Sequence, residues 1–251
     1  MNKLAYGHIF GLHSKGRPVE VACATMLRRE LPVFSHDYID SALHGDAEAA
    51  GYLSITDNQW RPFVLVCLYA CCRLSDGFKV ALSAIWDHDG PDVLATIDAP
   101  LLRDMFECGG HRPCDLPKLV TIYRGGIGSY EQLRKGWSWT TERGVAAWFA
   151  LRWGGVPLVI ETKIKTPRIL HASDDRNERE LVVPGVRNAS VSGTLEDWQR
   201  EAPIWRASVG MMCASYVATE PVQSVDAAMA EHAPQPEIVE GTYSTCGNER
   251  I

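Results

Sequence analysis

The stretch GWSWTTERGVAAWFALRWGGVPLVIETKIK, residues 136–165, changes its hydrophobic period twice and thereby decides the fold class. Residues 137–140 are typical of a short extended segment. Between residues 141 and 153 the apolar side chains recur at helical spacing, and Thr141 is the expected N-cap. Residues 157–165 alternate between apolar and polar, as a half-buried strand does. The stretch therefore predicts a strand, a helix and a second strand in succession.

Further strands are expected on both sides of this stretch. The β-branched run LVTIY at residues 119–123 predicts a strand that ends at Gly125 and Gly126. Downstream, residues 167–171 and 180–183 predict two more strands, with a polar turn at 173–177 between them. Residues 195–206 are expected to be helical, whereas the pattern of 207–218 fits a helix or a strand.

The chain before this β-rich part is expected to be helical from about residue 18 to 107. Apolar residues at helical spacing predict helices over 37–53, 57–74, 76–86 and 98–106. Asp57 and Ser75 occupy N-cap positions, and the pair Gly90-Pro91 should break the pattern.

These patterns predict an α+β protein in three parts. Residues 1–115 form a helical N-terminal region, and residues 116–232 form a mainly β domain with one helix crossing it. Residues 233–251 are rich in Pro and Gly, show little periodicity, and should form a loosely held tail.

Composition indicates an ordinary globular protein, with 46% apolar and 22% charged residues. A net charge of -6 offers no global attraction for nucleic acid or for an anionic membrane. The longest apolar run, residues 63–72, is about half of the roughly 20 residues that span a bilayer. No signal peptide is visible at the N-terminus, and the spacing of the eight cysteines does not resemble a disulfide framework. We therefore expect a cytoplasmic protein without membrane contact.

Three short segments hold the candidate chemistry. In Tyr123-Arg124-Gly125-Gly126, an arginine suited to gripping phosphate ends a strand, and two glycines allow a ligand to approach the backbone. In residues 136–141 (GWSWTT), hydroxyl groups lie along a strand edge. In residues 177–183 (NERELVV), two carboxylates enter an apolar strand, and like charges so close are costly unless they serve a ligand or a cation. Each segment alone also fits an ordinary strand end or solvated turn.

The order and spacing of the three segments resemble the R-S-E class of mono-ADP-ribosyltransferases. An arginine on a first strand is followed about 14 residues later by a Ser-x-Thr segment, and Glu-x-Glu comes about 40 residues further on. Residues 136–154 are also similar to a stretch found in small bacterial and phage proteins of this class. The resemblance covers residues 116–184 and implies a split β-sandwich that uses NAD as a substrate and requires no metal.

The resemblance implies a role for each matched residue in binding NAD. Arg124, with Tyr123 beside it, would hold the NAD phosphates and shape the nicotinamide pocket, and the backbone of Gly125 would bind the carboxamide. Ser138 matches the first serine of the family's Ser-Thr-Ser motif, which supports the catalytic Glu and the nicotinamide ribose. Thr140 matches the last hydroxyl of that motif.

At the middle position of this motif the chain has Trp139 instead of Thr, which leaves the role of that position in doubt. Trp148 and Phe149 fit a plain core, but by resemblance one of them lines the nicotinamide pocket, and we include Phe149 among the candidate NAD-binding residues.

The paired glutamates would perform the reaction. Glu180 matches the catalytic residue bonded to the ribose 2′-hydroxyl, and Glu178 matches the upstream residue that handles the acceptor. Cleavage of the nicotinamide–ribose bond builds positive charge on the ribose, so a carboxylate fixed beside it stabilises the transition state. In this family a Glu at the upstream position accompanies arginine acceptors, so protein arginine is the favoured acceptor.

Other functions stay open at this point. The acceptor could be a nucleic acid base, as in a toxin or a phage-defence enzyme, and a basic stripe of Arg134, Lys135, Arg143 and Arg152 would favour it. Water as acceptor would make the protein an NAD glycohydrolase, and a non-catalytic binding module is the remaining alternative. The helical region could cap the NAD cleft, recognise the target or bind an inhibitor or antitoxin protein.

Three weaker signals do not change this interpretation. Cys108, His111 and Cys114 have spacing that suits zinc, but no second cluster of ligands accompanies them. Residues 87–90 (DHDG) resemble the start of a calcium loop without its closing Glu, and we interpret them as a turn. Residues 125–128 (GGIG) lack the spacing of a dinucleotide-binding fingerprint.

Overall fold

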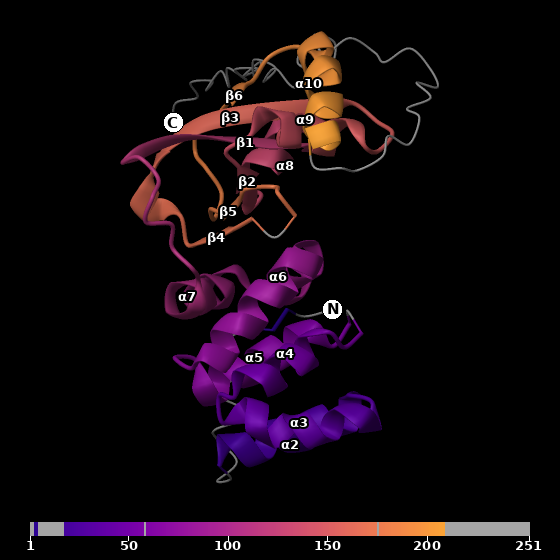
Figure 1. Ribbon diagram of the computed structural model, residues 1–251, viewed down its shortest axis with the longest axis vertical. Helices are drawn as coiled ribbons and strands as arrows, with labels where there is room; N and C mark the ends of the chain where they lie inside the picture. The colour runs from indigo at the N-terminus through magenta and orange to yellow at the C-terminus, as the bar shows by residue number, and fades with distance from the viewer. Residues whose placement is uncertain (1–2, 5–17, 58, 175, 209–251) are drawn as a thin grey trace, which may run out of the picture. The chain divides into compact units, whose positions relative to one another are not determined.

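The computed structural model of the protein describes residues 3–4, 18–57, 59–174 and 176–208. These residues fall within one compact unit, in which a series of helices precedes an antiparallel sheet (Figure 1). The predicted α+β class is confirmed. The predicted tail 233–251 and nearly all of the undecided segment 207–218 lie outside the described residues.

The N-terminal helices are closely packed, and all of them except α6 are short. They are α2 (Val19–Glu30), the 3-10 turn η1 (Val33–Ser35), α3 (His36–Leu43), α4 (Ala47–Ser54), α5 (Arg61–Cys72), α6 (Asp76–Thr96) and α7 (Ala99–Gly109). The single helix predicted over residues 37–53 is wrong, because α3 and α4 are separated at Gly45. Gly45 has a φ of 96°, a left-handed conformation that glycine adopts without strain, and Asp46 then caps α4 by accepting from Ala49 N at 2.7 Å.

The long helix α6 begins where the sequence predicts but continues beyond its predicted end. Ser75 caps it as predicted, by accepting from Phe78 N at 3.1 Å, whereas α5 begins at Arg61 rather than at the predicted Asp57. The pair Gly90-Pro91 does not end α6; the helix kinks at Asp89 and continues to Thr96.

The kink in α6 is fixed by a mostly buried ion pair. The Arg61 guanidinium on α5 donates to the Asp89 carboxylate, and the two side chains are 13% and 6% exposed. Arg61 Nε also donates to the Thr56 carbonyl at 2.8 Å. Residues 87–90, interpreted from sequence as a turn, therefore belong to a helix whose irregularity is held by a partner on α5.

Six strands form one open antiparallel sheet in the order β4-β5-β2-β1-β3-β6. Their bounds are β1 Leu119–Ile127, β2 Ser138–Thr140, β3 Pro157–Lys165, β4 His171–Ser173, β5 Glu180–Val182 and β6 Ser190–Val191. The centre of the sheet is the nine-residue pairing of β1 with β3. The described strands thus form a single sheet, and the two facing sheets of a split sandwich stay an inference from the resemblance.

The sheet corrects three sequence-based expectations. Strand β1 does not end at Gly125 but continues through both glycines to Ile127. The strand predicted over residues 167–171 is mostly wrong: the 3-10 turn η2 (Thr166–Arg168) comes first, and β4 begins only at His171. The two-residue strand β6 is too short to leave a periodic signal and was not predicted.

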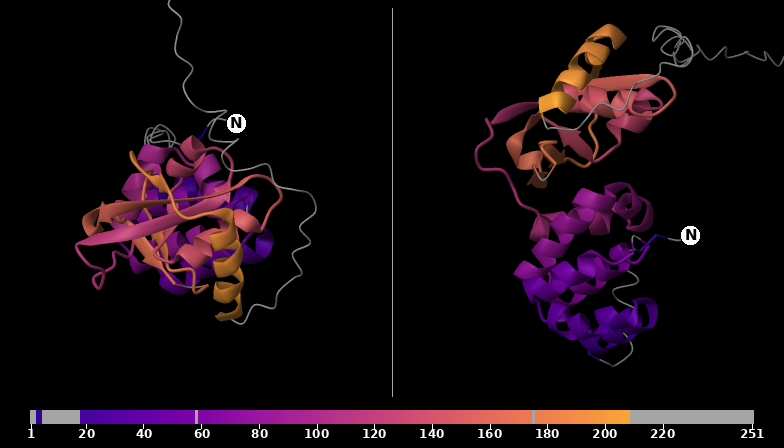
Figure 2. Two further views of the ribbon diagram at one scale, coloured as in Figure 1. Left: turned by 90° about the horizontal axis from the view of Figure 1, so that it is seen from above. Right: turned by 45° about the vertical axis from the view of Figure 1, so that its right-hand side comes forward.

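Three helices accompany the sheet; those over residues 141–153 and 195–206 were predicted, and the short helix over residues 130–134 was not. They are α8 (Tyr130–Arg134), α9 (Arg143–Leu151) and α10 (Leu195–Ser208), the last of which packs along α9 (Figure 2). The predicted helix over 141–153 is confirmed as α9, although its N-cap is Glu142 rather than Thr141. The Arg143 guanidinium on α9 pairs with the Glu201 carboxylate on α10.

Two hydrophobic cores meet at β5, whose residues alternate between them. Val182 belongs to the core of the N-terminal helices, together with Trp137 and Leu170, whereas Leu181 and Val183 belong to the core of the sheet with α9 and α10. Because side chains alternate along a strand, Glu180 lies on the same face of β5 as Val182. The first residue of β5 is therefore directed toward α6.

Candidate functional site

Arg124 lies in the middle of β1 and reaches across to β2. Its Nη1 donates to the Ser138 carbonyl, which joins the first two predicted motifs directly. Gly136 makes room for the guanidinium, because a Cβ at that position would lie 2.2 Å from Arg124 Cζ. The Nε of Arg124 is buried and has no hydrogen-bond partner among the described residues. One hydrogen bond, to Ser138, thus holds Arg124, and its buried Nε is left unsatisfied.

Glu180 begins β5 and receives hydrogen bonds from two different parts of the chain. In the sheet it is paired with Thr140 of β2 and with Ser173 of β4. Trp86 Nε1 on α6 donates to Glu180 Oε1 at 3.2 Å, and the Ser138 side chain is a second hydrogen-bond partner of the carboxylate. The carboxylate is therefore oriented by a helix on one side and a neighbouring strand on the other.

The protonation of Glu180 is governed mainly by its burial. Desolvation raises the pKa of this carboxyl above its usual value, and the hydrogen bonds from Ser138 and Trp86 act in the opposite direction. The charges of Asp87 and Glu178 add to the rise in pKa. The positive charge of Arg124 lies close enough to interact with Glu180, although burial is the main influence on Arg124 and lowers the pKa of its guanidinium.

Glu178 is held in the turn before β5. Its backbone carbonyl accepts from Thr140 Oγ1 at 2.7 Å, and its carboxylate pairs with Arg176 at 3.3 Å. Asn177 and Arg179 on either side have positive φ values of 55° and 45°. Because the backbone here is not extended, the alternation of side chains along a strand does not place Glu178 on the same face as Glu180. The function of Thr140 in this structure is to tie the turn to β2.

The remaining predicted residues lie on the α9 side. Gly125 has no room for a side chain, because a Cβ would lie 1.7 Å from the Ala146 carbonyl of α9. Packing of β1 on α9 is therefore a sufficient reason for this glycine. The Tyr123 ring packs against the core of the sheet, and burial raises the pKa of its phenol.

Phe149 lies in an aromatic group on α9. Its ring stacks edge-on against Trp148 at 4.9 Å, and the Arg152 guanidinium lies 5.2 Å from its centre. These are contacts within α9 itself, so the role of Phe149 in a nicotinamide pocket stays a prediction.

Sequence reasoning missed the contribution of α6 to the site. Trp86 donates to Glu180. The adjacent Asp87 is only 8% exposed, and its charge raises the pKa of Glu180. The available signal was a tryptophan followed directly by an acidic residue at the end of a predicted helix. A second link between α6 and the sheet is His171 of β4, whose Nε2 lies 3.4 Å from Ser83 Oγ. The Nδ1 of His171 accepts from His111 N at 2.9 Å. Burial lowers the pKa of His171 to about 4, so this histidine is neutral at physiological pH.

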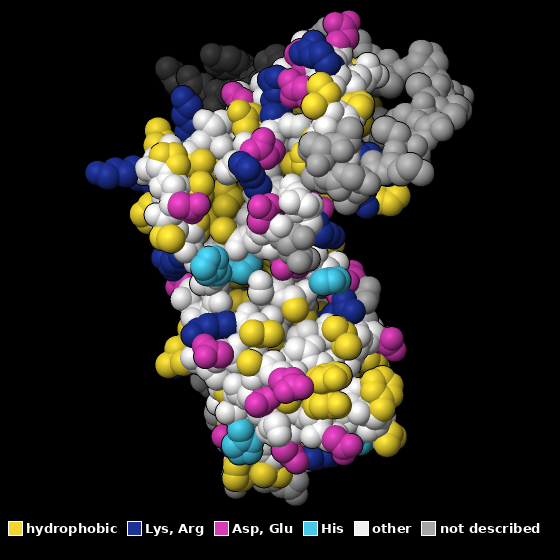
Figure 3. Space-filling model, viewed as in Figure 1, with side chains coloured by type: hydrophobic (Ala, Val, Ile, Leu, Met, Phe, Trp, Pro, Cys, Tyr) yellow, Lys and Arg dark blue, Asp and Glu magenta, His cyan; other side chains and the backbone are white. Residues whose placement is uncertain are grey.

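The weaker sequence signals do not form sites in the described part of the chain. Two members of the suggested basic stripe are neutralised by acidic partners: Arg134 pairs with Glu131 and Arg143 with Glu201. Acidic and basic side chains are interspersed on the face shown in Figure 3. Among the described residues no group of three or more His, Cys, Asp or Glu could hold a metal ion, and no helix could cross a membrane.

Comparison of the chain with protein-family models, with curated proteins and with solved structures gives no match. The functional interpretation therefore depends on the residues of the site and on their geometry.

The packing of Gly125 gives a first testable prediction. Gly125→Ala should destabilise the protein by about 3 kcal/mol, because the new methyl group would force β1 away from α9. The adjacent Gly126 is the matched control, since a Cβ there would meet only Leu133 at 3.8 Å, and Gly126→Ala should change stability by about 0.5 kcal/mol or less. Urea denaturation of both variants measures the difference; equal midpoints would contradict the packing argument.

Proposed function

We propose that the protein is an NAD-dependent mono-ADP-ribosyltransferase. The observation that supports this most strongly is the placement of Arg124, Ser138 and Glu180 on the three adjacent strands β1, β2 and β5. Residues that are 56 positions apart in the sequence, Arg124 and Glu180, interact electrostatically, and Ser138 contacts both. This is the grouping that the resemblance to the R-S-E class implies.

The geometry is suited to cleavage of a glycosidic bond to a positively charged leaving group. Glu180 is a carboxylate fixed by Trp86 and Ser138, so it needs little reorientation when positive charge develops on a ribose. Arg124 offers a guanidinium that fits phosphate oxygens and would hold the diphosphate of NAD while the bond breaks. The products would be nicotinamide and an ADP-ribosylated acceptor.

Glu178 supports a protein arginine as the acceptor. Its carboxylate already pairs with the Arg176 guanidinium at 3.3 Å, in a turn next to Glu180. An arginine of the target could replace Arg176 in this pair, which would bring its nitrogen toward the ribose. A nucleic acid acceptor receives less support, because Arg134 and Arg143 of the suggested basic stripe are already paired with acidic residues.

The helical region contributes a hydrogen-bond donor to the same site. Because α6 supplies Trp86 to Glu180, we propose that it closes one side of the NAD cleft and orients the catalytic carboxylate.

Incubation of the purified protein with labelled NAD and a cell lysate tests the proposal. We expect label in the protein fraction, release of nicotinamide, and a loss of about 100-fold or more in Glu180→Ala, the usual effect of removing a group that stabilises a transition state. The matched control is Glu107→Ala, which removes an exposed carboxylate on α7 and should keep full activity.

The distribution of label separates the alternatives. Label in the nucleic acid fraction would select a base as the acceptor, and loss of NAD without labelled macromolecules would select water. No consumption of NAD in any fraction would contradict the proposal.

The pH dependence of this activity tests the role of Trp86. Since Glu180 must be ionised and its pKa is raised, activity should fall as the pH is lowered through that raised pKa. Trp86→Phe removes a hydrogen bond that lowers the pKa of Glu180, so the acidic limb of the pH–rate profile should move to higher pH. The rate at neutral pH should fall by about tenfold.

Trp137→Phe makes the same change of ring at a buried position in the core of the N-terminal helices, and is the control. An acidic limb that shifts equally in both variants, or in neither, would contradict a specific contact between Trp86 and Glu180.

A further inference from the structure

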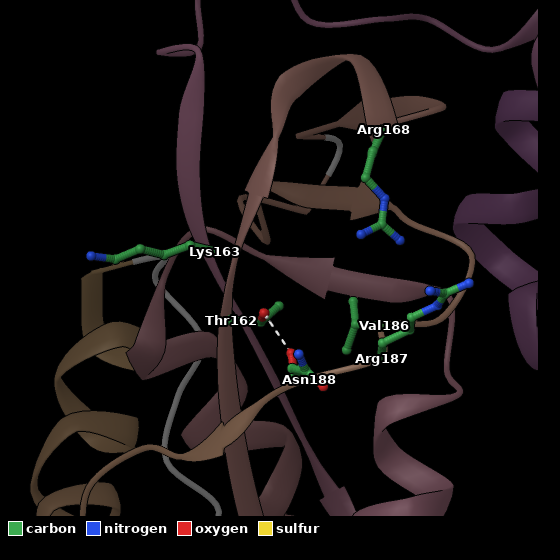
Figure 4. A pocket seen from close by; sticks show the side chains of 6 residues that line it. All are labelled: Thr162, Lys163, Arg168, Val186, Arg187 and Asn188. Atoms are coloured by element: carbon green, nitrogen blue, oxygen red, sulfur yellow. Dashed lines mark hydrogen bonds between the residues drawn. The ribbon is translucent and has the colours of Figure 1, made fainter.

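A concave site that includes none of the proposed NAD-binding residues lies beside β3. The pocket has a volume of about 480 Å³, and lies between β3, the turn η2 and the loop that precedes β6 (Figure 4). Its lining residues are Thr162, Lys163, Arg168, Val186, Arg187 and Asn188. The size is within the range of about 300–1,000 Å³ that is typical of small-ligand sites.

The pocket is basic in a chain whose net charge is -6. Three of its six lining residues are cationic and none is acidic. Every ion pair found in the described part of the chain uses other cations, and none includes Lys163, Arg168 or Arg187. Figure 4 shows Arg168 and Arg187 directed to the same side, while Lys163 extends away from them. The positive charge is therefore concentrated at the two arginines.

The backbone around these arginines is held in place. Arg168 Nη2 donates to the Gly185 carbonyl at 3.3 Å, and Thr162 Oγ1 donates to the Asn188 carbonyl at 2.7 Å. Val186 N donates to the Arg134 carbonyl at 2.8 Å, which fixes the middle of the loop. Because one nitrogen of Arg168 is anchored, its other N–H groups are kept near the pocket at a reduced cost in side-chain entropy.

The pocket is distinct from the Glu180 site. Its lining residues include none of Arg124, Ser138, Glu178 and Glu180, and β2 and β1 stand between β3 and β5 in the sheet.

We propose that this pocket binds the phosphate group of an anionic ligand through Arg168 and Arg187. A guanidinium presents paired N–H donors that match two phosphate oxygens. Two guanidinium groups that line one pocket and take part in no ion pair of the described chain fit the charge of a phosphate better than that of a carboxylate. The site does not depend on the proposed transferase activity.

Calorimetric titration with inorganic pyrophosphate and anisotropy with a fluorescent single-stranded oligonucleotide test the site in the full chain. At low ionic strength at least one probe should bind, and the double variant Arg168→Gln/Arg187→Gln should weaken that binding tenfold or more. The control Arg103→Gln removes an exposed cation on α7 that takes part in no ion pair of the described chain. Its affinity should equal that of the wild type.

The two probes distinguish the sources of phosphate. Pyrophosphate binding that depends on the two arginines identifies a small phosphorylated ligand, and oligonucleotide binding alone identifies a polymer backbone; either result supports the site. No binding of either probe to the wild type, or equal binding by the wild type and the folded double variant, would overturn it. Circular dichroism of the double variant confirms its fold, and the single variants replace it if it does not fold.

Discussion

The candidate site depends on keeping the carboxylate of Glu180 partly buried at the junction of two hydrophobic cores. Burial raises the pKa of Glu180, and neighbouring groups that favour the ionised carboxylate act against this rise. Those groups come from separate elements: Trp86 from α6, Ser138 from β2 and Arg124 from β1. The N-terminal helices and the sheet must therefore pack together before the carboxylate can be held in its functional state.

Local pattern was sufficient to predict most of the elements that form this arrangement. Residues 157–165 alternate clearly, and β3 has the predicted bounds. Ser75 marks the start of α6 because its hydroxyl satisfies a backbone donor within its own helix. The errors arise where distant contacts decide. At Gly45, where the predicted helix is split, a side chain would collide with Ser75, and the kink of α6 next to Pro91 is held by Arg61 of α5.

The identities of the site residues were easier to predict from the sequence than the contacts that orient them. Arg124, Ser138 and Glu180 were chosen by motif spacing, and pairing of β2 with both β1 and β5 brings them together. The contribution of Trp86 was not predictable, because it lies 94 positions from Glu180 in a helix whose pattern indicates only burial. At Gly125 the sequence suggested a function that the packing does not require. Its place in a motif suggested close approach of a ligand, whereas the Ala146 carbonyl of α9 occupies the space where a side chain would lie.

A crystal structure of the Glu180→Gln variant with NAD would test the central claim most directly, because the substitution should prevent turnover while keeping the shape of the site. The account predicts NAD with its nicotinamide ribose against the side chain at position 180 and its diphosphate at Arg124. Density for NAD only at the pocket of Arg168 and Arg187, or no bound NAD at saturating concentration, would contradict the assignment of Arg124, Ser138 and Glu180 as an NAD site.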